Sequence, residues 1–299
     1  MRSHEVLWNY FQVTKPRMVA ANLISAAGGF FLASQGHTSI GLFLCVMTGL
    51  LCVVASGCVL NNYIDRGIDR GMARTCQRAL ATGAISGNAS LVYAALLGVS
   101  GMAILWAGTN PLALAMALAG LAIYVVVYSL YLKRNSVYST VVGSLAGAAP
   151  PLAAYCAVRN RFDIGALIVL AIYSLWQIPH SYAITIFRYD DYVAAAIPVM
   201  PVKSSIMATK KHIVWHIVAF IFAAQMLTAF GYAGYAYLAS ATVLGLGWLY
   251  MALSGAKARG DRLWARRVYL FSILIIFILS IMMSIDSVRP PAWPGMGQS

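Results

Sequence analysis

Charged side chains are scarce in this chain of 299 residues. They make up 10% of the sequence, and only eight of them are acidic. A soluble domain would carry roughly 25% charged residues. Because 61% of the residues are hydrophobic and the mean hydropathy is +0.76, we exclude a soluble globular domain and predict an integral membrane protein.

Cysteine is also scarce, and its spacing excludes two classes of site. The five cysteines form no Cys-x-x-Cys pair and most lie in apolar runs, which argues against a zinc site and a disulfide framework. The net charge of +13 comes from basic residues spread over several loops, without a nucleic-acid motif. We therefore expect the anionic membrane surface, and no nucleic acid, as their partner.

Long apolar stretches predict an all-α, polytopic protein, since a membrane span needs about 20 apolar residues. Nine stretches meet this criterion, and we assign them to a single domain that covers residues 1–299. They are residues 18–35, 40–62, 89–108, 111–132, 137–157, 164–187, 212–231, 233–253 and 267–287.

Polar segments lie before and between these stretches. Residues 1–16 mix apolar and polar side chains and predict a short helix on the membrane surface. Residues 63–88, 188–211 and 254–266 predict loops that cap the cytoplasmic end of the bundle.

The distribution of basic residues predicts the orientation in the membrane. Of the 21 Lys and Arg residues, 18 fall on the side of the N-terminus and the cap loops, and only Arg159, Arg161 and Arg289 fall on the other. The positive-inside rule therefore predicts a cytoplasmic N-terminus and a periplasmic C-terminus.

Two aspartates stand at the end of the second apolar stretch. Asn61, Asp65 and Asp69 are four residues apart, so on a helix they share one face. Paired carboxylates suit Mg²⁺, which proteins usually hold with one or two carboxylates plus substrate phosphates. We predict a metal site here, with incidental aspartates in a positively charged loop as the alternative.

Arginines follow at the same spacing. Arg66, Arg70, Arg74 and Arg78 form a second column if the helix continues, and the guanidinium group matches the geometry of phosphate. A helix that ends at Gly71 would shorten this column beyond Arg70.

Three further groups of polar residues are candidates. Lys133 and Arg134 end the fourth stretch and would complete a cationic rim around a diphosphate, or would anchor the span at the interface. Asp190 and Asp191 follow the sixth stretch on the same side, as a second metal site or as a solvated loop. His180 lies inside that stretch, where a histidine indicates contact with a polar or metal-bearing substrate unless it bonds to a carbonyl.

These residues belong to longer motifs, which resemble the UbiA superfamily of intramembrane prenyltransferases and, within it, the bacterial heme O synthases. The resemblance covers most of the chain. It rests on Asn-Asn-Tyr-Ile-Asp-Arg-x-Ile-Asp-Arg at 61–70, Tyr128-Ser129 with Leu132-Lys133-Arg134, Gly147-Ala148-Ala149-Pro150-Pro151, Trp176-Gln177-x-Pro179-His180-Ser181-Tyr182, and Asp191-Tyr192 with Ile197-Pro198-Val199.

The resemblance implies nine helices around a central cavity in the bacterial inner membrane. It implies Mg²⁺-dependent transfer of the farnesyl group of farnesyl diphosphate to a vinyl group of heme B, with addition of water, to give heme O and diphosphate. Asp65, Asp69 and Asp191 would be catalytic. Mg²⁺ would be held by Asn61, Asp65, Asp69, Asp190 and Asp191, diphosphate by Arg66, Arg70, Arg74, Arg78, Tyr128, Lys133 and Arg134, and heme by Trp176 and His180.

The sequence leaves alternatives open. Ala195 stands where the second motif of the superfamily has an aspartate, so Asp190 substitutes for it or one ligand is lost. The first site would look the same in a sister enzyme that prenylates an aromatic quinone precursor. A heme carrier or transporter is a third interpretation, although its polar groups would lie near the bilayer midplane. A terminal oxidase or a heme A synthase is the expected protein partner.

Overall fold

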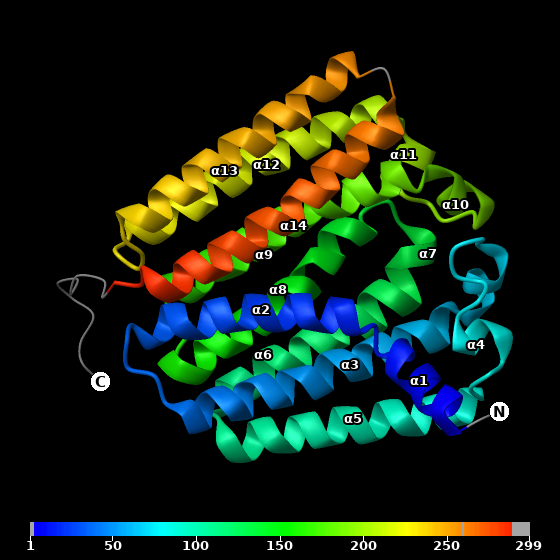
Figure 1. Cartoon of the computed structure of the whole chain (residues 1–299), viewed down its shortest axis with the longest axis horizontal. Helices are drawn as coiled ribbons and strands as arrows, with labels where there is room; N and C mark the ends of the chain where they lie inside the picture. The colour runs from blue at the N-terminus through cyan, green and yellow to red at the C-terminus, as the bar shows by residue number, and fades with distance from the viewer. Residues whose placement is uncertain (1–2, 259, 289–299) are drawn as a thin grey trace.

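The computed structural model describes residues 3–258 and 260–288 (Figure 1). Within these ranges, nine helical segments are long and apolar enough to cross a membrane, as the sequence predicted. Eight of them are α2 (Pro16–Ser34), α3 (Ile40–Gly71), α5 (Gly87–Gly108), α8 (Ser139–Arg159), α9 (Ile164–Phe187), α12 (Ile206–Ala229), α13 (Tyr235–Leu253) and α14 (Asp261–Ile285). The remaining span joins α6 (Pro111–Ala122), the π-helix η1 (Ile123–Leu132) and α7 (Lys133–Asn135). The chain is therefore a multi-pass, all-α membrane protein.

Short helices gather at one end of the bundle, at the right in Figure 1. They are α1 (Ser3–Val13), α4 (Ala79–Thr82), α10 (Tyr189–Ala194) and α11 (Met200–Lys203). The first occupies the predicted surface segment, and the others lie in the predicted cap segments 63–88 and 188–211. The third cap segment, 254–266, consists of a 3₁₀ turn (Ser254–Lys257) and the first residues of α14. Three of the basic residues that predict the orientation, Arg2, Arg259 and Arg289, lie outside the described residues.

The structure corrects the predicted end of the second span. Helix α3 continues past residue 62 to Gly71. Residues 63–71 of the predicted cap loop therefore belong to the helix, and the loop begins after Gly71. Hydropathy falls at Asn61, but the helix continues because its polar side chains find partners on other segments. The helix therefore extends the predicted polar column beyond the apolar stretch.

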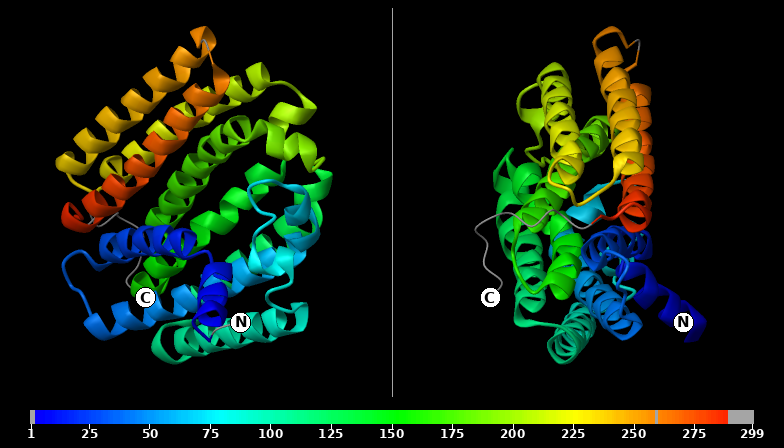
Figure 2. Two further views of the ribbon diagram at one scale, coloured as in Figure 1. Left: turned by 45° about the vertical axis from the view of Figure 1, so that its right-hand side comes forward. Right: turned by 90° about the vertical axis from the view of Figure 1, so that its left-hand side faces the viewer.

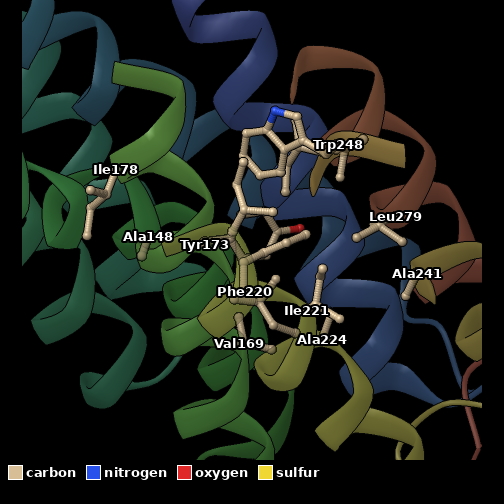
Figure 3. Close-up of a cluster of buried hydrophobic side chains, with 14 of the residues drawn as sticks. Ala148, Val169, Tyr173, Ile178, Phe220, Ile221, Ala224, Ala241, Trp248 and Leu279 are labelled. Carbon is tan, nitrogen blue, oxygen red and sulfur yellow. The ribbon is translucent and has the colours of Figure 1, made fainter. Parts of the chain in front are cut away.

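Two groups of long helices share α8, which lies between them in Figures 1 and 2. One hydrophobic cluster joins α2, α3, α5, α6 and α8, and a larger one joins α8, α9, α12, α13 and α14 together with the end of α2. Figure 3 shows part of the larger cluster, where Tyr173, Phe220 and Trp248 are fully buried. The first and last spans, α2 and α14, also pack against each other and close the bundle.

Glycine allows close contacts around α8. A Cβ atom on Gly29 would lie 2.3 Å from the carbonyl oxygen of Pro151, and one on Gly147 would lie 1.6 Å from Oε1 of Gln177. Small residues at such positions let membrane helices approach each other closely. The second contact brings together the motifs at 147–151 and 176–182, which lie apart in sequence.

Candidate active site

The polar column on α3 is buried. Asn61, Asp65 and Asp69 are exposed by only 3%, 2% and 4%, respectively. Nδ2 of Asn61 donates to Oδ2 of Asp65 at 3.0 Å and to Oγ of Ser129 at 3.0 Å. Since a buried carboxylate is costly without a partner, the two aspartates need compensating groups from elsewhere in the fold.

Basic side chains from two other segments supply this compensation. Lys133 donates to Oδ2 of Asp65, and Nη1 of Arg78 lies 3.1 and 2.8 Å from the two carboxylate oxygens of Asp69. Oδ1 of Asp65, in contrast, is buried and has no hydrogen-bond partner among the described residues. An unsatisfied carboxylate oxygen beside an amide and a second carboxylate fits a Mg²⁺ ion that takes its remaining ligands from phosphates and water.

The π-helix η1 positions the partners of this column. Oγ of Ser129 donates to the carbonyl oxygen of Tyr124, five residues earlier, at 2.7 Å. Asn61 and Asp65 are four residues apart on α3, and their partners Ser129 and Lys133 are four residues apart on the fourth span. The two spans therefore run side by side in the same direction at the site. Single π-helical segments are rare and are often found at functional sites.

The predicted arginine column does not continue as a helix. Because α3 ends at Gly71, Arg74 and Arg78 lie in the following loop, which confirms the alternative of a column shortened beyond Arg70. The loop nevertheless turns Arg78 back onto Asp69 and places Nε of Arg74 3.9 Å from Oδ2 of Asp191. The chain reversal after Gly71 thus brings two arginines to the acids.

Three other predicted phosphate-binding arginines are bonded to backbone carbonyls. Arg66 donates to Tyr63 (2.6 Å), Arg70 to Ala81 (2.9 Å) and Arg134 to Ile64 (2.7 Å). The guanidinium group of Arg66 also lies 4.0 Å from the centre of the Tyr63 ring. These contacts give the three arginines local structural partners. The phosphate-binding role of these arginines stays a prediction.

The second acidic pair divides into two environments. The Asp191 side chain is 20% exposed and pairs with Arg74, whereas Asp190 is exposed. Met72, Ile197 and Val199 form a small hydrophobic cluster that ties the segment after α10 to the end of α3. Asp191 therefore pairs with the loop that follows α3, the helix that carries the first acidic pair.

The acids do not form one preassembled centre. Among the described residues, no three His, Cys, Asp or Glu side chains lie close enough together to hold a metal. The predicted ligands instead come from two helices that lie far apart in sequence, α3 and α10. Such a site needs phosphate oxygens to complete the coordination of Mg²⁺, as is usual for this ion.

The predicted heme residues face α14. Nε1 of Trp176 donates to the carbonyl oxygen of Ser272 at 2.8 Å, and Nδ1 of His180 lies 2.7 Å from Oγ of the same serine. Because the Ser272 hydroxyl donates to the carbonyl oxygen of Tyr269, its oxygen accepts from Nδ1–H of His180. This tautomer puts the imidazole lone pair on Nε2, the atom that could contact a substrate or its iron.

Sequence reasoning missed three residues at this site. Ser129 and Tyr192 were part of the motifs without an assigned role, and Lys15 stood outside the candidate set. Lys15 donates to Oδ1 of Asn61, from the turn before α2. Burial is the main effect that raises the pKa of the Tyr192 phenol, with Tyr128 next, while Lys133 lowers it, so Tyr192 faces the same cluster. A lysine directly before the first span was the available signal for Lys15.

The match to a family model settles the membership of the chain. The model of the UbiA prenyltransferase family matches residues 22–281. The chain belongs to the UbiA prenyltransferase family. It is 57% identical over 281 residues to a protein of Cronobacter sakazakii named protoheme IX farnesyltransferase, covering 94% of this chain and 95% of that protein. A protein of Chromohalobacter salexigens with the same name is 57% identical over 277 residues, covering 93% and 94%.

Solved UbiA structures share the fold. A structure described as digeranylgeranylglyceryl phosphate synthase superposes with a TM-score of 0.77 at 18% identity, covering 94% of this chain and 98% of that one. A UbiA homologue from Archaeoglobus fulgidus bound to GPP and Mg²⁺ superposes with a TM-score of 0.74 at 15% identity, covering 92% and 99%. These similarities support the helical arrangement and carry no substrate assignment.

Proposed function

We propose that the protein transfers the farnesyl group of farnesyl diphosphate to a vinyl group of heme B. Water adds to the product, so one heme B, one farnesyl diphosphate and one water give heme O and diphosphate. The observation that carries this proposal is the 57% identity, over more than nine tenths of the chain, to proteins named protoheme IX farnesyltransferase. A terminal oxidase or a heme A synthase stays the predicted protein partner.

The acids on α3 would hold the diphosphate end of the substrate. Asn61, Asp65 and Asp69 would bind Mg²⁺ from one side and Asp191 from the other, and the unsatisfied Oδ1 of Asp65 supports this assignment. Bound Mg²⁺ would supply electrophilic stabilisation of the departing diphosphate. The Mg²⁺ complex of the Archaeoglobus fulgidus homologue, which has the same fold, is consistent with this assignment.

Basic side chains would stabilise the negative charge that develops on the leaving group. Lys133 and Arg78 already contact the carboxylates, and Arg74 bridges toward Asp191. Fixed charges in a site that excludes water are worth more than the same charges in solvent. We propose that these cations turn from carboxylate to phosphate oxygens when the substrate binds.

The acceptor would lie on the side of His180 and Trp176. Their hydrogen bonds to Ser272 fix both rings against α14, and Nε2 of His180 carries the lone pair. Heme held there would present a vinyl group to the allylic carbon of the farnesyl group. The surrounding apolar helices would exclude bulk water from the allylic cation that forms as diphosphate leaves.

A competition assay tests the acceptor. Purified protein receives farnesyl diphosphate and Mg²⁺ with equal amounts of heme B and an aromatic quinone precursor, and the products are separated by mass. Heme carrying a farnesyl group plus water, absent with EDTA, supports the proposal. Prenylation of the aromatic acid alone, or no prenylated product at all, contradicts it and points to the sister enzyme or to a carrier.

We also propose that the end with the short helices is cytoplasmic, in the inner membrane of a bacterium. Cys76 lies in the loop after α3 at this end. A membrane-impermeant maleimide should therefore label Cys76 in inverted vesicles and not in right-side-out vesicles. Labelling from the periplasmic side would reverse the proposed orientation.

A further inference from the structure

The turn between α1 and α2 holds Lys15 in an unusual conformation. Lys15 has φ 54° and ψ 63°, in the left-handed region, directly before Pro16. Residues with a Cβ atom adopt this region at a cost, and glycine or asparagine is the usual choice there. A strained residue that persists suggests that its side chain has a function.

Two successive asparagines of α3 fix this turn. Nδ2 of Asn62 donates to the carbonyl oxygen of Val13 at 2.7 Å, and Nζ of Lys15 donates to Oδ1 of Asn61. The hydroxyl of Thr14 closes the end of α1 by donating to the carbonyl oxygen of Phe11 at 2.7 Å. The Lys15 side chain therefore enters the proposed Mg²⁺–diphosphate site from the first span.

Each side chain of the polar column has its own basic partner. Lys15 contacts Asn61, Lys133 contacts Asp65, and Arg78 contacts Asp69. These contacts come from three separate parts of the chain, all meeting on one face of α3. The pattern marks Lys15 as the third member of a cationic set.

The partner of Lys15 differs from the other two because it is neutral. Asn61 offers an amide oxygen, and its own Nδ2 is already shared between Asp65 and Ser129. Three cations thus face two carboxylates, and one positive charge is uncompensated. Burial lowers the pKa of Lys15 to about 8, Cys58 raises it, and the nearby cations Arg78 and Lys133 lower it further.

We propose that Lys15 is a diphosphate ligand. In the free protein its ammonium group rests on the amide oxygen of Asn61. In the complex it donates to a phosphate oxygen and leaves that amide oxygen to the metal. The inference rests on the proposed function, which puts a diphosphate in this site, and adds a ligand from the first span.

Binding of inorganic pyrophosphate tests this role without the heme reaction. The full-length protein in lipid nanodiscs is titrated with pyrophosphate in the presence of Mg²⁺ by calorimetry. The variants are Lys15→Met, Lys15→Arg and Lys15→Gly. Gln35→Gly is the matched control, because Gln35 has φ 48° at the opposite end of α2.

We expect Lys15→Met and Lys15→Gly to raise the Kd by about 10-fold or more, the loss typical of a hydrogen bond to a charged group. Lys15→Arg should lie between them and the unaltered protein. Glycine relieves the left-handed strain, so Lys15→Gly should lose affinity without a lower unfolding temperature. Gln35→Gly should bind normally. The KM for farnesyl diphosphate should rise in Lys15→Met while that for heme B stays constant.

Unchanged pyrophosphate affinity in Lys15→Met would overturn the inference, whatever the result for Lys15→Gly. Lys15 would then have only a structural role between α2 and α3. The proposed function fails separately. If the unaltered protein binds Mg²⁺–pyrophosphate through Lys15 but prenylates no heme, Lys15 is a diphosphate ligand and the proposed acceptor is wrong. An unaltered protein that does not bind Mg²⁺–pyrophosphate contradicts both.

Discussion

Lys133 donates a hydrogen bond to Oδ2 of Asp65, while Oδ1 of the same carboxylate is buried without a partner among the described residues. The two residues come from the second and fourth spans, which meet in register through the π-helix. The pairing keeps the buried acid compensated before substrate binds. It also leaves one carboxylate oxygen without a hydrogen bond and therefore available to the proposed Mg²⁺ ion.

Removing one partner of the Asp65–Lys133 pair should destabilise the protein more than replacing both partners. In Lys133→Met, the buried charge of Asp65 loses its partner, and the free energy of unfolding should fall by up to about 3 kcal/mol. The loss is at the low end for buried pairs because the Lys133 side chain is 18% exposed. The double variant Asp65→Asn/Lys133→Met should recover most of this stability without activity. Thermal unfolding in detergent checks both, and additive losses would contradict the pairing.

The two adjacent aspartates of α10 should differ in effect. Asp191→Asn should lower the rate of farnesyl transfer by about 100-fold, since it removes a charged group from the site. Asp190→Asn should leave the rate nearly unchanged, because that side chain is exposed. Steady-state kinetics at saturating Mg²⁺ decides between them. Equal losses in both variants would show that Asp190 replaces the aspartate that the superfamily motif has at the position of Ala195.

Ser272 should act on heme through His180. Ser272→Ala removes the acceptor that fixes the imidazole tautomer, and losing such a supporting hydrogen bond typically costs about 10-fold. The KM for heme B should rise by that factor and the KM for farnesyl diphosphate should not change. Ser284→Ala, on the same helix, is the control. A rise in both KM values would indicate a general disturbance of α14.

Gly147 should tolerate no added methyl group. A Cβ atom there would lie 1.6 Å from Oε1 of Gln177, so Gly147→Ala should lower the free energy of unfolding by about 1–3 kcal/mol. Gly41→Ala, whose Cβ atom would meet nothing within 4 Å, should be neutral or slightly stabilising. Unfolding temperatures of the two variants provide the test, and equal values would show that α8 and α9 pack less closely.

Hydropathy predicted the number of spans and, for Ile164–Phe187, both ends of the helix. It failed where charged residues are buried in pairs. Helix α12 begins at Ile206, before the predicted residue 212, because Lys210 is bonded to Asp261 at 2.5 Å and to the carbonyl oxygen of Gly255 at 2.7 Å. A charge that hydropathy counts as exposed is buried in the fold.

The site shows the same division. Periodicity placed Asn61, Asp65 and Asp69 on one face, since four-residue spacing is a local property of a helix. It could not decide whether the arginines continue that helix, because the answer depends on where the chain turns after Gly71. Lys15 lies 46 residues from Asn61, and only the left-handed turn brings it there.

The most direct test of the account measures diphosphate release and heme O formation in the same reaction. The unaltered protein, supplied with heme B, farnesyl diphosphate and Mg²⁺, should release one diphosphate for each heme O. Asp65→Asn, or chelation of Mg²⁺, should abolish both products together. Heme O formed by Asp65→Asn at the normal rate, or diphosphate released without prenylated heme, would contradict the claim that α3 carries the site of farnesyl transfer to heme.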